Sequence, residues 1–155
     1  AVDLGLFQSL GPVAGVRSQL LVNEPLVLVV SPRHPLAHRD HITPDELSRH
    51  AFVGPLRDSH YFHMIDQVLR RIGLHDYELA MELQDFAAVI EMARHGAGIA
   101  CEMLCCVSNE IRSGLLVPLQ LAAPAPTMQI RCANLSPKSE PVRKLIEMMR
   151  GTEPA

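Results

Sequence analysis

The sequence predicts an α/β domain in which mostly parallel sheets are flanked by helices. Hydrophobic residues make up 48% and charged residues 20% of the 155, which is the balance of a folded α/β protein. Strand-like and helix-like segments alternate along most of the chain with short connections, the pattern of βαβ units. Residues 26–30 are consecutive apolar residues, typical of a strand buried on both faces of a parallel sheet.

The strands are predicted from apolar runs and from alternation of polar with apolar residues. Residues 2–7 and 26–30 are largely apolar, whereas residues 77–83 alternate, as in a half-buried strand. Shorter apolar segments that end at glycine or proline supply the remaining strands. We expect strands over residues 2–7, 19–22, 26–30, 51–53, 77–83, 98–101, 115–119 and 128–133.

The helices are predicted from capping residues and from the spacing of apolar positions. Thr43 is suited to be an N-cap, with Pro44 at the first helical position and Glu46 completing a capping box. Asp85 is a second N-cap, and Gly96 follows the helix that it opens. We expect a helix that begins at Thr43 and further helices over residues 61–72, 86–95 and 107–113. A last helix is expected to begin at Ser136–Pro137. Its apolar residues Val142, Leu145, Ile146 and Met149 lie on one face.

Charge and composition exclude several classes of partner. Lys and Arg total 14 against 17 Asp and Glu, so this stretch carries no basic DNA-binding footprint. Aromatic residues reach only 4% and Trp is absent, which disfavours a stacking platform for single-stranded nucleic acid. The apolar runs are too short to span a bilayer, and residues 1–3 resemble no signal segment. We expect a cytoplasmic protein without a membrane partner.

The cysteines and histidines predict no metal site and no cofactor. Four cysteines without a secretory signal indicate reduced thiols, and we expect those in the cluster of residues 101–106 to be buried rather than redox-active. Glu102, within that cluster, disfavours a reactive thiolate. His34, His38 and His41 have ligand-like spacing, to which His60 and His63 could add. However, His34 belongs to a proline-flanked corner, and a flexible loop is a poor closed zinc site.

Four segments, in matching order and spacing, resemble the effector-binding domain of LysR-type transcriptional regulators. They are the strand and His-Pro-Leu-Ala corner over 26–37, the segment 89–100 with both glycines, the segment 113–119 and the strand 2–6. One departure is that Cys101-Glu102-Met103-Leu104 replaces the family's usual proline ending. The family's helix-turn-helix, linker helix and first part of lobe I have no counterpart here, so we interpret the chain as a fragment.

The resemblance implies a two-lobed fold of the type 2 periplasmic-binding-protein kind. It assigns residues 22–119 to a complete lobe II, and residues 1–21 and 120–155 to a partial lobe I. In this architecture a small organic effector lies in the cleft between the lobes, near helix N-termini. Carried over position by position, the resemblance implies effector contacts with Phe7, Gln8, Gly54, Pro55, Ser59, His60, Tyr61, Gln84, Asp85, Phe86 and Ile99.

Asp85 allows two interpretations. Capping of its own helix is favoured, because Asp is a preferred N-cap residue. If its carboxylate instead faces the cleft, its charge disfavours an anion there and favours an amine-bearing or neutral effector.

The sequence leaves two functions open. No Ser/His/Asp set or Gly-rich phosphate loop is present, so we expect no enzyme. The favoured function is ligand sensing within a cytoplasmic transcription factor that forms a homodimer or homotetramer and contacts DNA only through the N-terminal domain that this chain lacks. The alternative is a stand-alone solute-binding protein or a binding-protein-like enzyme. A helix-turn-helix encoded upstream would favour the first, and a signal peptide the second.

Overall fold

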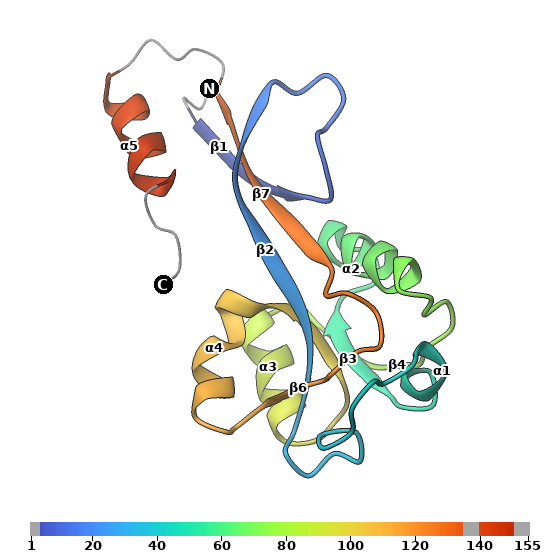
Figure 1. Ribbon diagram of the computed structural model, residues 1–155. Coiled ribbons are helices and arrows are strands. Elements are labelled where there is room, and N and C mark those ends of the chain that lie inside the picture. Colours follow the sequence, from blue (N-terminus) through green and yellow to red (C-terminus); the bar gives the residue numbers. More distant parts are fainter. Residues whose placement is uncertain (1–3, 135–139, 151–155) are drawn as a thin grey trace. The chain divides into compact units, whose positions relative to one another are not determined.

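The computed structural model describes residues 4–134 and 140–150, which belong to two compact units (Figure 1). Unit 1 comprises residues 1–24 and 127–155, and unit 2 comprises residues 25–126. The elements are β1 (Leu4–Ser9), β2 (Ser18–Val30), α1 (Pro44–Leu47), β3 (Phe52–Pro55), α2 (His60–Arg71), β4 (Leu79–Leu83), α3 (Phe86–Arg94), β5 (Ala100–Met103), α4 (Leu104–Arg112), β6 (Val117–Pro118), β7 (Thr127–Asn134) and α5 (Glu140–Arg150). Within the described ranges, no helix has both the length and the apolar character needed to cross a lipid bilayer.

Unit 1 is built on an antiparallel pair of strands. β1 pairs with β7 over its whole length, from Leu4 opposite Asn134 to Ser9 opposite Gln129. The guanidinium of Arg131 in β7 is buried and donates to the Ser18 hydroxyl at 3.0 Å and to the side-chain oxygen of Gln129 at 2.8 Å. These hydrogen bonds attach the start of β2 to β7, and they satisfy a charged group that would be costly to bury alone.

Unit 2 contains a mixed sheet in which only β2 runs against its neighbours. β3 and β4 are parallel, and a parallel bridge between Phe52 and Ile99 joins β3 to the segment that leads into β5. β2 pairs antiparallel with β5 on one side and with β6 on the other. The expectation of mostly parallel sheets therefore holds for the pair β3–β4 and for the bridge to the segment before β5, and is wrong for the pairs of β2 with β5 and β6 and for the β1–β7 pair of unit 1.

The direction of β2 is a property of the folded sheet. The connection between Val30 and Phe52 contains one helix, α1, of four residues. The length of this connection is compatible with either direction of the next strand, because a crossover of a dozen or more residues can join parallel strands.

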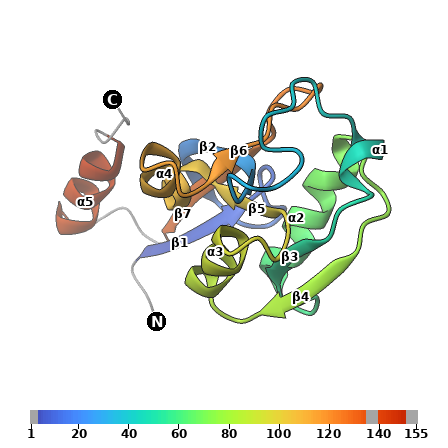
Figure 2. The ribbon, with the colours of Figure 1, turned by 90° about the horizontal axis from the view of Figure 1, so that it is seen from below.

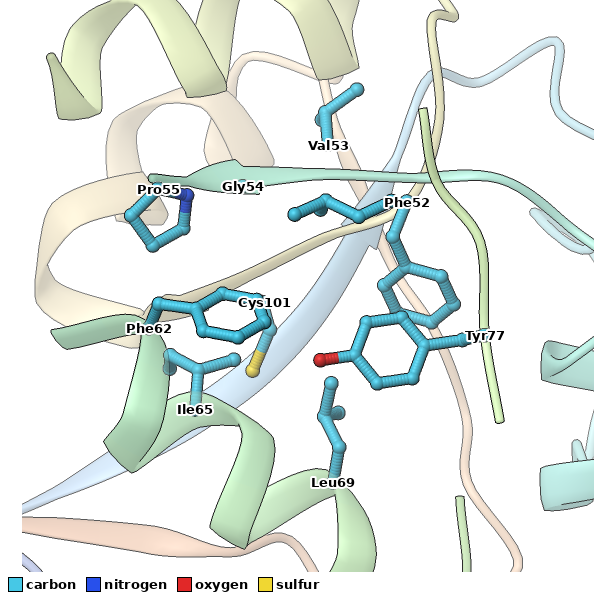
Figure 3. Close-up of a pocket in the computed structure, with 10 residues that line it drawn as sticks. Phe52, Val53, Gly54, Pro55, Phe62, Ile65, Leu69, Tyr77 and Cys101 are labelled. Atoms are coloured by element: carbon cyan, nitrogen blue, oxygen red, sulfur yellow. The ribbon is translucent and has the colours of Figure 1, made fainter. Parts of the chain in front are cut away.

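Helices cover both faces of the unit 2 sheet, with α2 and α3 on opposite sides of β3 (Figure 2). Side chains alternate along a strand, so neighbours in sequence face different layers. Phe52 packs toward α2, whereas Val53 points away from it (Figure 3). The core on the second face consists of Val29, Val53, Val89, Ala93, Ala100, Val107 and Leu116.

Most local predictions are confirmed. The differences occur at element boundaries that no capping residue, glycine or proline marks in the sequence. The Thr43 hydroxyl accepts from the Glu46 N–H at 3.3 Å, and the Glu46 carboxylate accepts from the Thr43 N–H at 3.0 Å, which completes the capping box. β2 is one strand of 13 residues rather than two segments. α4 begins at Leu104 rather than at residue 107 as predicted. The sequence did not reveal this start, because the N-cap Met103 makes no side-chain capping hydrogen bond.

Two further predictions concern the C-terminal half. The strand expected over 115–119 is reduced to Val117–Pro118. The predicted helix start at Ser136–Pro137 lies outside the described residues. In α5, Ile146 is buried, whereas Leu145, which the sequence places on the same apolar face, is 45% exposed.

The corner after β2 is braced by His34. Its ring nitrogen Nδ1 accepts from the Leu36 N–H at 3.2 Å, and its ring centroid lies 4.8 Å from that of His50. Burial, and secondarily His50, lowers the pKa of His34, which favours the neutral ring that can accept this hydrogen bond. The histidine of the His-Pro-Leu-Ala corner is therefore structural, as its position in the sequence predicts.

Candidate functional site

Three helices of unit 2 begin where three parallel strands end. β3, β4 and β5 run in the same direction, so their carboxyl ends lie at one edge of the sheet. Each strand continues, after a short connection or none, into α2, α3 or α4 respectively. The first N–H groups of a helix have no partner within it, and its N-terminus carries a partial positive charge. Polar ligands of α/β proteins bind at such an edge.

The loop that leads into α2 is held in place by side chains. The hydroxyl of Ser59 accepts from the Phe62 N–H at 3.1 Å and caps the helix. The backbone N–H and the Nε of Arg57 each donate to the carboxylate of Glu82 in β4 at 3.0 Å. This hydrogen bonding, led by the Arg57 backbone N–H, lowers the pKa of Glu82. The start of α2 is thereby fixed to the neighbouring strand.

Asp85 caps α3, as the favoured interpretation of the sequence predicts. Its Oδ1 accepts from the Ala87 N–H at 3.0 Å, and its backbone is extended, as is usual for an N-cap. The side chain is exposed. The exposed carboxylate therefore places negative charge at a helix start that would otherwise attract anions.

The capping role of Asp85 gives a stability prediction. Asp85→Ala should lower the free energy of unfolding by about 1 kcal/mol, because one N–H of the first turn loses its acceptor. Asp85→Asn should lower it by much less, since the amide oxygen still accepts. Urea unfolding of the two variants measures the difference, and equal stabilities would contradict the capping role.

Tyr61 and Phe86 form an aromatic pair between two helix starts. Their ring centroids lie 4.7 Å apart at 85°, an edge-to-face contact. Tyr61 is buried, with 7% of its surface exposed, whereas Phe86 is 46% exposed. The structure thus brings together two of the predicted contact residues, and one of them presents an aromatic ring to the solvent.

The other predicted contact residues lie in different surroundings. His60 and Gln84 are exposed and adjoin Tyr61 and Asp85 in sequence. Gly54, Pro55 and Ile99 are buried in the sheet, where the Ile99 N–H donates to Ala51 and its carbonyl accepts from Val53, both at 2.9 Å. Phe7 and Gln8 are half-buried in β1 of unit 1, opposite Arg131 and Ile130 of β7.

A small cavity lies between β3 and α2, but its size excludes an organic ligand. Its volume is about 10 Å³, roughly the space that one water molecule requires. The Cys101 thiol and the Tyr77 hydroxyl project into it among otherwise apolar side chains (Figure 3). Its lining consists of Phe52, Val53, Gly54, Pro55, Phe62, Ile65, Leu69, Tyr77, Leu79 and Cys101. We interpret it as a packing gap beneath Gly54 and Pro55.

Glu102 is a buried carboxyl at this edge that the sequence-based site did not include. Only 1% of its surface is exposed, and its Oε2 accepts from the Tyr61 hydroxyl at 3.4 Å. Its Oε1 has no hydrogen-bond partner among the described residues. Burial raises the pKa of Glu102 to about 7, against the smaller opposing effect of the Tyr61 hydrogen bond.

The family of the chain is decided by its sequence. The sequence profile of the LysR substrate binding domain matches residues 1–153. The chain belongs to the LysR substrate-binding domain family. It is 29% identical over 150 residues to the transcriptional activator protein LysR of Escherichia coli K12, covering 96% of this chain and 46% of the relative. A probable RuBisCO transcriptional regulator of Cyanidioschyzon merolae is 29% identical over 107 residues, covering 68% and 35%.

Solved structures support the fold of this LysR substrate-binding domain. The regulatory domain of Synechocystis PCC6803 CcmR in complex with 2-PG has a TM-score of 0.79 at 22% identity, covering 96% of this chain and 72% of that one. The effector-binding domain of QuiR in complex with shikimate has a TM-score of 0.70 at 16% identity, covering 96% and 69%. These similarities confirm the predicted two-lobed class. The domain spans less than half the length of the two curated relatives.

A signal for Glu102 was present in the sequence of the LysR substrate-binding domain. The residue lies in the segment where the resemblance predicts apolar residues and a proline, so an acidic side chain there is a local departure. An acidic residue inside an apolar strand is rarely buried without a partner or a function. Its relation to Tyr61, 41 positions away, is visible only in the folded chain.

The prediction that the cysteines of the 101–106 cluster are buried is confirmed for Cys101 and wrong for Cys105 and Cys106. The latter two are exposed, with their sulfurs 3.9 Å apart. The reason is the earlier start of α4, whose buried side is occupied by Val107. Across the described part of the LysR substrate-binding domain, no group of three or more His, Cys, Asp and Glu residues is arranged to hold a metal ion.

Proposed function

We propose that this chain senses a small organic effector within a cytoplasmic LysR-type transcriptional regulator. The family match over residues 1–153 carries the proposal, because the related full-length proteins are transcriptional regulators. The effector-bound CcmR and QuiR domains share the fold, which supports a role in ligand binding for this domain. No catalytic step is proposed.

The proposed effector site is the edge of unit 2 at which α2 and α3 begin. The exposed face of Phe86 and the edge-to-face contact with Tyr61 would provide an aromatic wall. Ser59 and Asp85 hold the two helix starts, and His60 and Gln84 would supply polar groups beside them. Gly54, Pro55 and Ile99 would form the base, and the resemblance assigns Phe7 and Gln8 of unit 1 to the same ligand.

We further propose that units 2 and 1 correspond to lobe II and partial lobe I. Effector binding would then alter DNA affinity through the arrangement of lobes or subunits. A ligand shifts such an equilibrium only by its difference in affinity for the two states. DNA would be bound through an N-terminal helix-turn-helix of the intact regulator, acting as a homodimer or homotetramer.

The test uses the intact regulator, its operator DNA and two variants. A thermal-shift screen of small organic molecules should give compounds that stabilise the protein and change its operator affinity in fluorescence anisotropy. Phe86→Ala should weaken binding of such a compound about tenfold, equivalent to about 1.4 kcal/mol, because the aromatic wall is lost.

Leu115→Ala is the matched control. Leu115 is 43% exposed, close to the 46% of Phe86, and lies on the segment after α4. Its replacement should leave compound binding unchanged. Equal losses in both variants, or compounds that bind without any effect on operator affinity, would count against the proposed function.

A further inference from the structure

Glu102 is a buried acid with half of its hydrogen-bonding capacity unused. It lies in β5, opposite Val27 of β2, and 1% of its surface is exposed. The hydroxyl of Tyr61 reaches Oε2, whereas Oε1 has no partner within the described part of the chain. Burying a carboxyl without partners costs stability, so such a group in a native protein needs an explanation.

Among the residues that the structure describes, no cationic side chain forms an ion pair with this carboxyl. Its neighbours with titratable groups are Tyr61 of α2 and Cys101 of its own strand, with Cys106 of α4 close to Tyr61. Each of these titratable neighbours is therefore either neutral or negatively charged, and none of them is a cation.

Glu102 lies at the same edge as the aromatic pair. Tyr61, which donates to Glu102, packs edge-to-face on Phe86 of α3. A carboxylate bonded to the hydroxyl of a tyrosine that packs on a second aromatic ring brings together the two features that attract organic cations, namely a negative charge and aromatic rings. The two helix starts are unsuited to an anion, because Ser59 and Asp85 already accept from their N–H groups and Asp85 adds a negative charge.

We propose that Glu102 is the specificity residue of the effector site and that the effector carries a positively charged nitrogen, such as an ammonium or guanidinium group. This inference rests on the proposed function of the edge. Oε1 accepts a hydrogen bond from the ligand cation, and the rings of Tyr61 and Phe86 pack against it. Because the Tyr61 hydroxyl donates to Glu102, rotation of the Tyr61 side chain accompanies entry of the ligand.

The proposal has a distinctive dependence on pH. A bound cation favours the ionised carboxylate, so binding releases a proton from Glu102 wherever the carboxyl is protonated in the free protein. Because burial raises the pKa of Glu102 to about 7, cation affinity should increase about tenfold between pH 6 and pH 8. A purely structural role for Glu102 would produce no such change.

The experiment measures four probes by isothermal titration calorimetry on the intact regulator at pH 6 and pH 8. The probes are n-butylammonium, n-butylguanidinium, butanoate and 1-butanol, which share a chain length and differ in charge. We expect saturable binding of the two cations only. Glu102→Gln, which keeps the shape and removes the charge, should weaken them at least about tenfold, a loss of roughly 1.4 kcal/mol, and abolish the pH dependence.

Glu78→Gln is the control, because it removes an exposed carboxylate that precedes β4. It should leave cation binding unchanged. Preferential binding of butanoate or 1-butanol, or cation binding that Glu102→Gln does not weaken, would overturn the inference while leaving an effector site in place. Absence of binding by all four probes would also overturn it, and the proposed function would then be judged separately by the operator assay with Phe86→Ala.

Discussion

Glu102→Leu is expected to stabilise the protein at pH 8 by about 2 kcal/mol and to destabilise it by about 1 kcal/mol below pH 5, where only the loss of the Tyr61 hydrogen bond remains. The pKa of this carboxyl is about 7 in the folded chain, above the ordinary value of 4.5 that the unfolded chain retains. The native state therefore binds more protons between these values, and its stability falls as pH rises through this window. Full ionisation of Glu102 in the folded protein costs about 3 kcal/mol. Glu102→Leu removes this cost but also loses the hydrogen bond from Tyr61, which is worth about 1 kcal/mol.

Urea unfolding of the intact protein at pH 5 and pH 8 measures this effect. Hydrogen exchange of the β5 amides shows whether the change in stability arises in β5, the strand that carries Glu102. Glu78→Leu, at an exposed position, should change stability by less than about 0.5 kcal/mol at either pH. A wild-type protein whose stability does not change between pH 5 and pH 8 would contradict the prediction. Stabilisation with loss of cation binding would mark Glu102 as a residue retained for function.

Gly98→Ala should destabilise the protein by about 3 kcal/mol, because backbone atoms occupy the space that a side chain would need. A Cβ at this position would lie 2.6 Å from the Ala51 carbonyl oxygen and 3.2 Å from the Phe52 carbonyl carbon. The adjacent Ile99 N–H donates to that same Ala51 oxygen at 2.9 Å. Relief of the clash therefore requires the segment that leads into β5 to separate from β3, which breaks the parallel bridge between Phe52 and Ile99.

Gly11→Ala is the matched control, since a Cβ at Gly11 would meet no atom within 4 Å. Its stability should stay within about 1 kcal/mol of the wild type. Thermal and urea unfolding of both variants provide the comparison. A Gly98→Ala protein as stable as the Gly11→Ala protein would show that the two strands separate at little cost.

The local features of the fold could be predicted because they depend on neighbouring residues. The capping box of Thr43 and Glu46, the Asp85 cap and the His34 corner each involve side chains within three positions of their partners. Such contacts recur wherever the same residues occur in the same order. The exposure of Cys105 and Cys106 could not be predicted in the same way, because α4 begins without a polar capping residue.

The site could be predicted only in part. The family resemblance directed attention to Tyr61 and Phe86, and the structure brings their rings to 4.7 Å. Glu102 was visible in the sequence only as a departure from the apolar pattern, with no indication of its partner. The antiparallel direction of β2 was missed because alternating strands and helices do not reveal which strands become neighbours.

By itself, the sequence determined the fold class, the family and the helix starts at Thr43 and Asp85, since these depend on residue order and short-range hydrogen bonds. The tertiary structure alone decided that Tyr61 of α2 contacts both Phe86 of α3 and the buried Glu102 of β5. These contacts of Tyr61 require three strands to end at one edge of the sheet. Which strands become neighbours is decided by packing of the whole sheet rather than by any local pattern. The burial that raises the pKa of Glu102, and with it the expected preference for a cation, arises only from that packing.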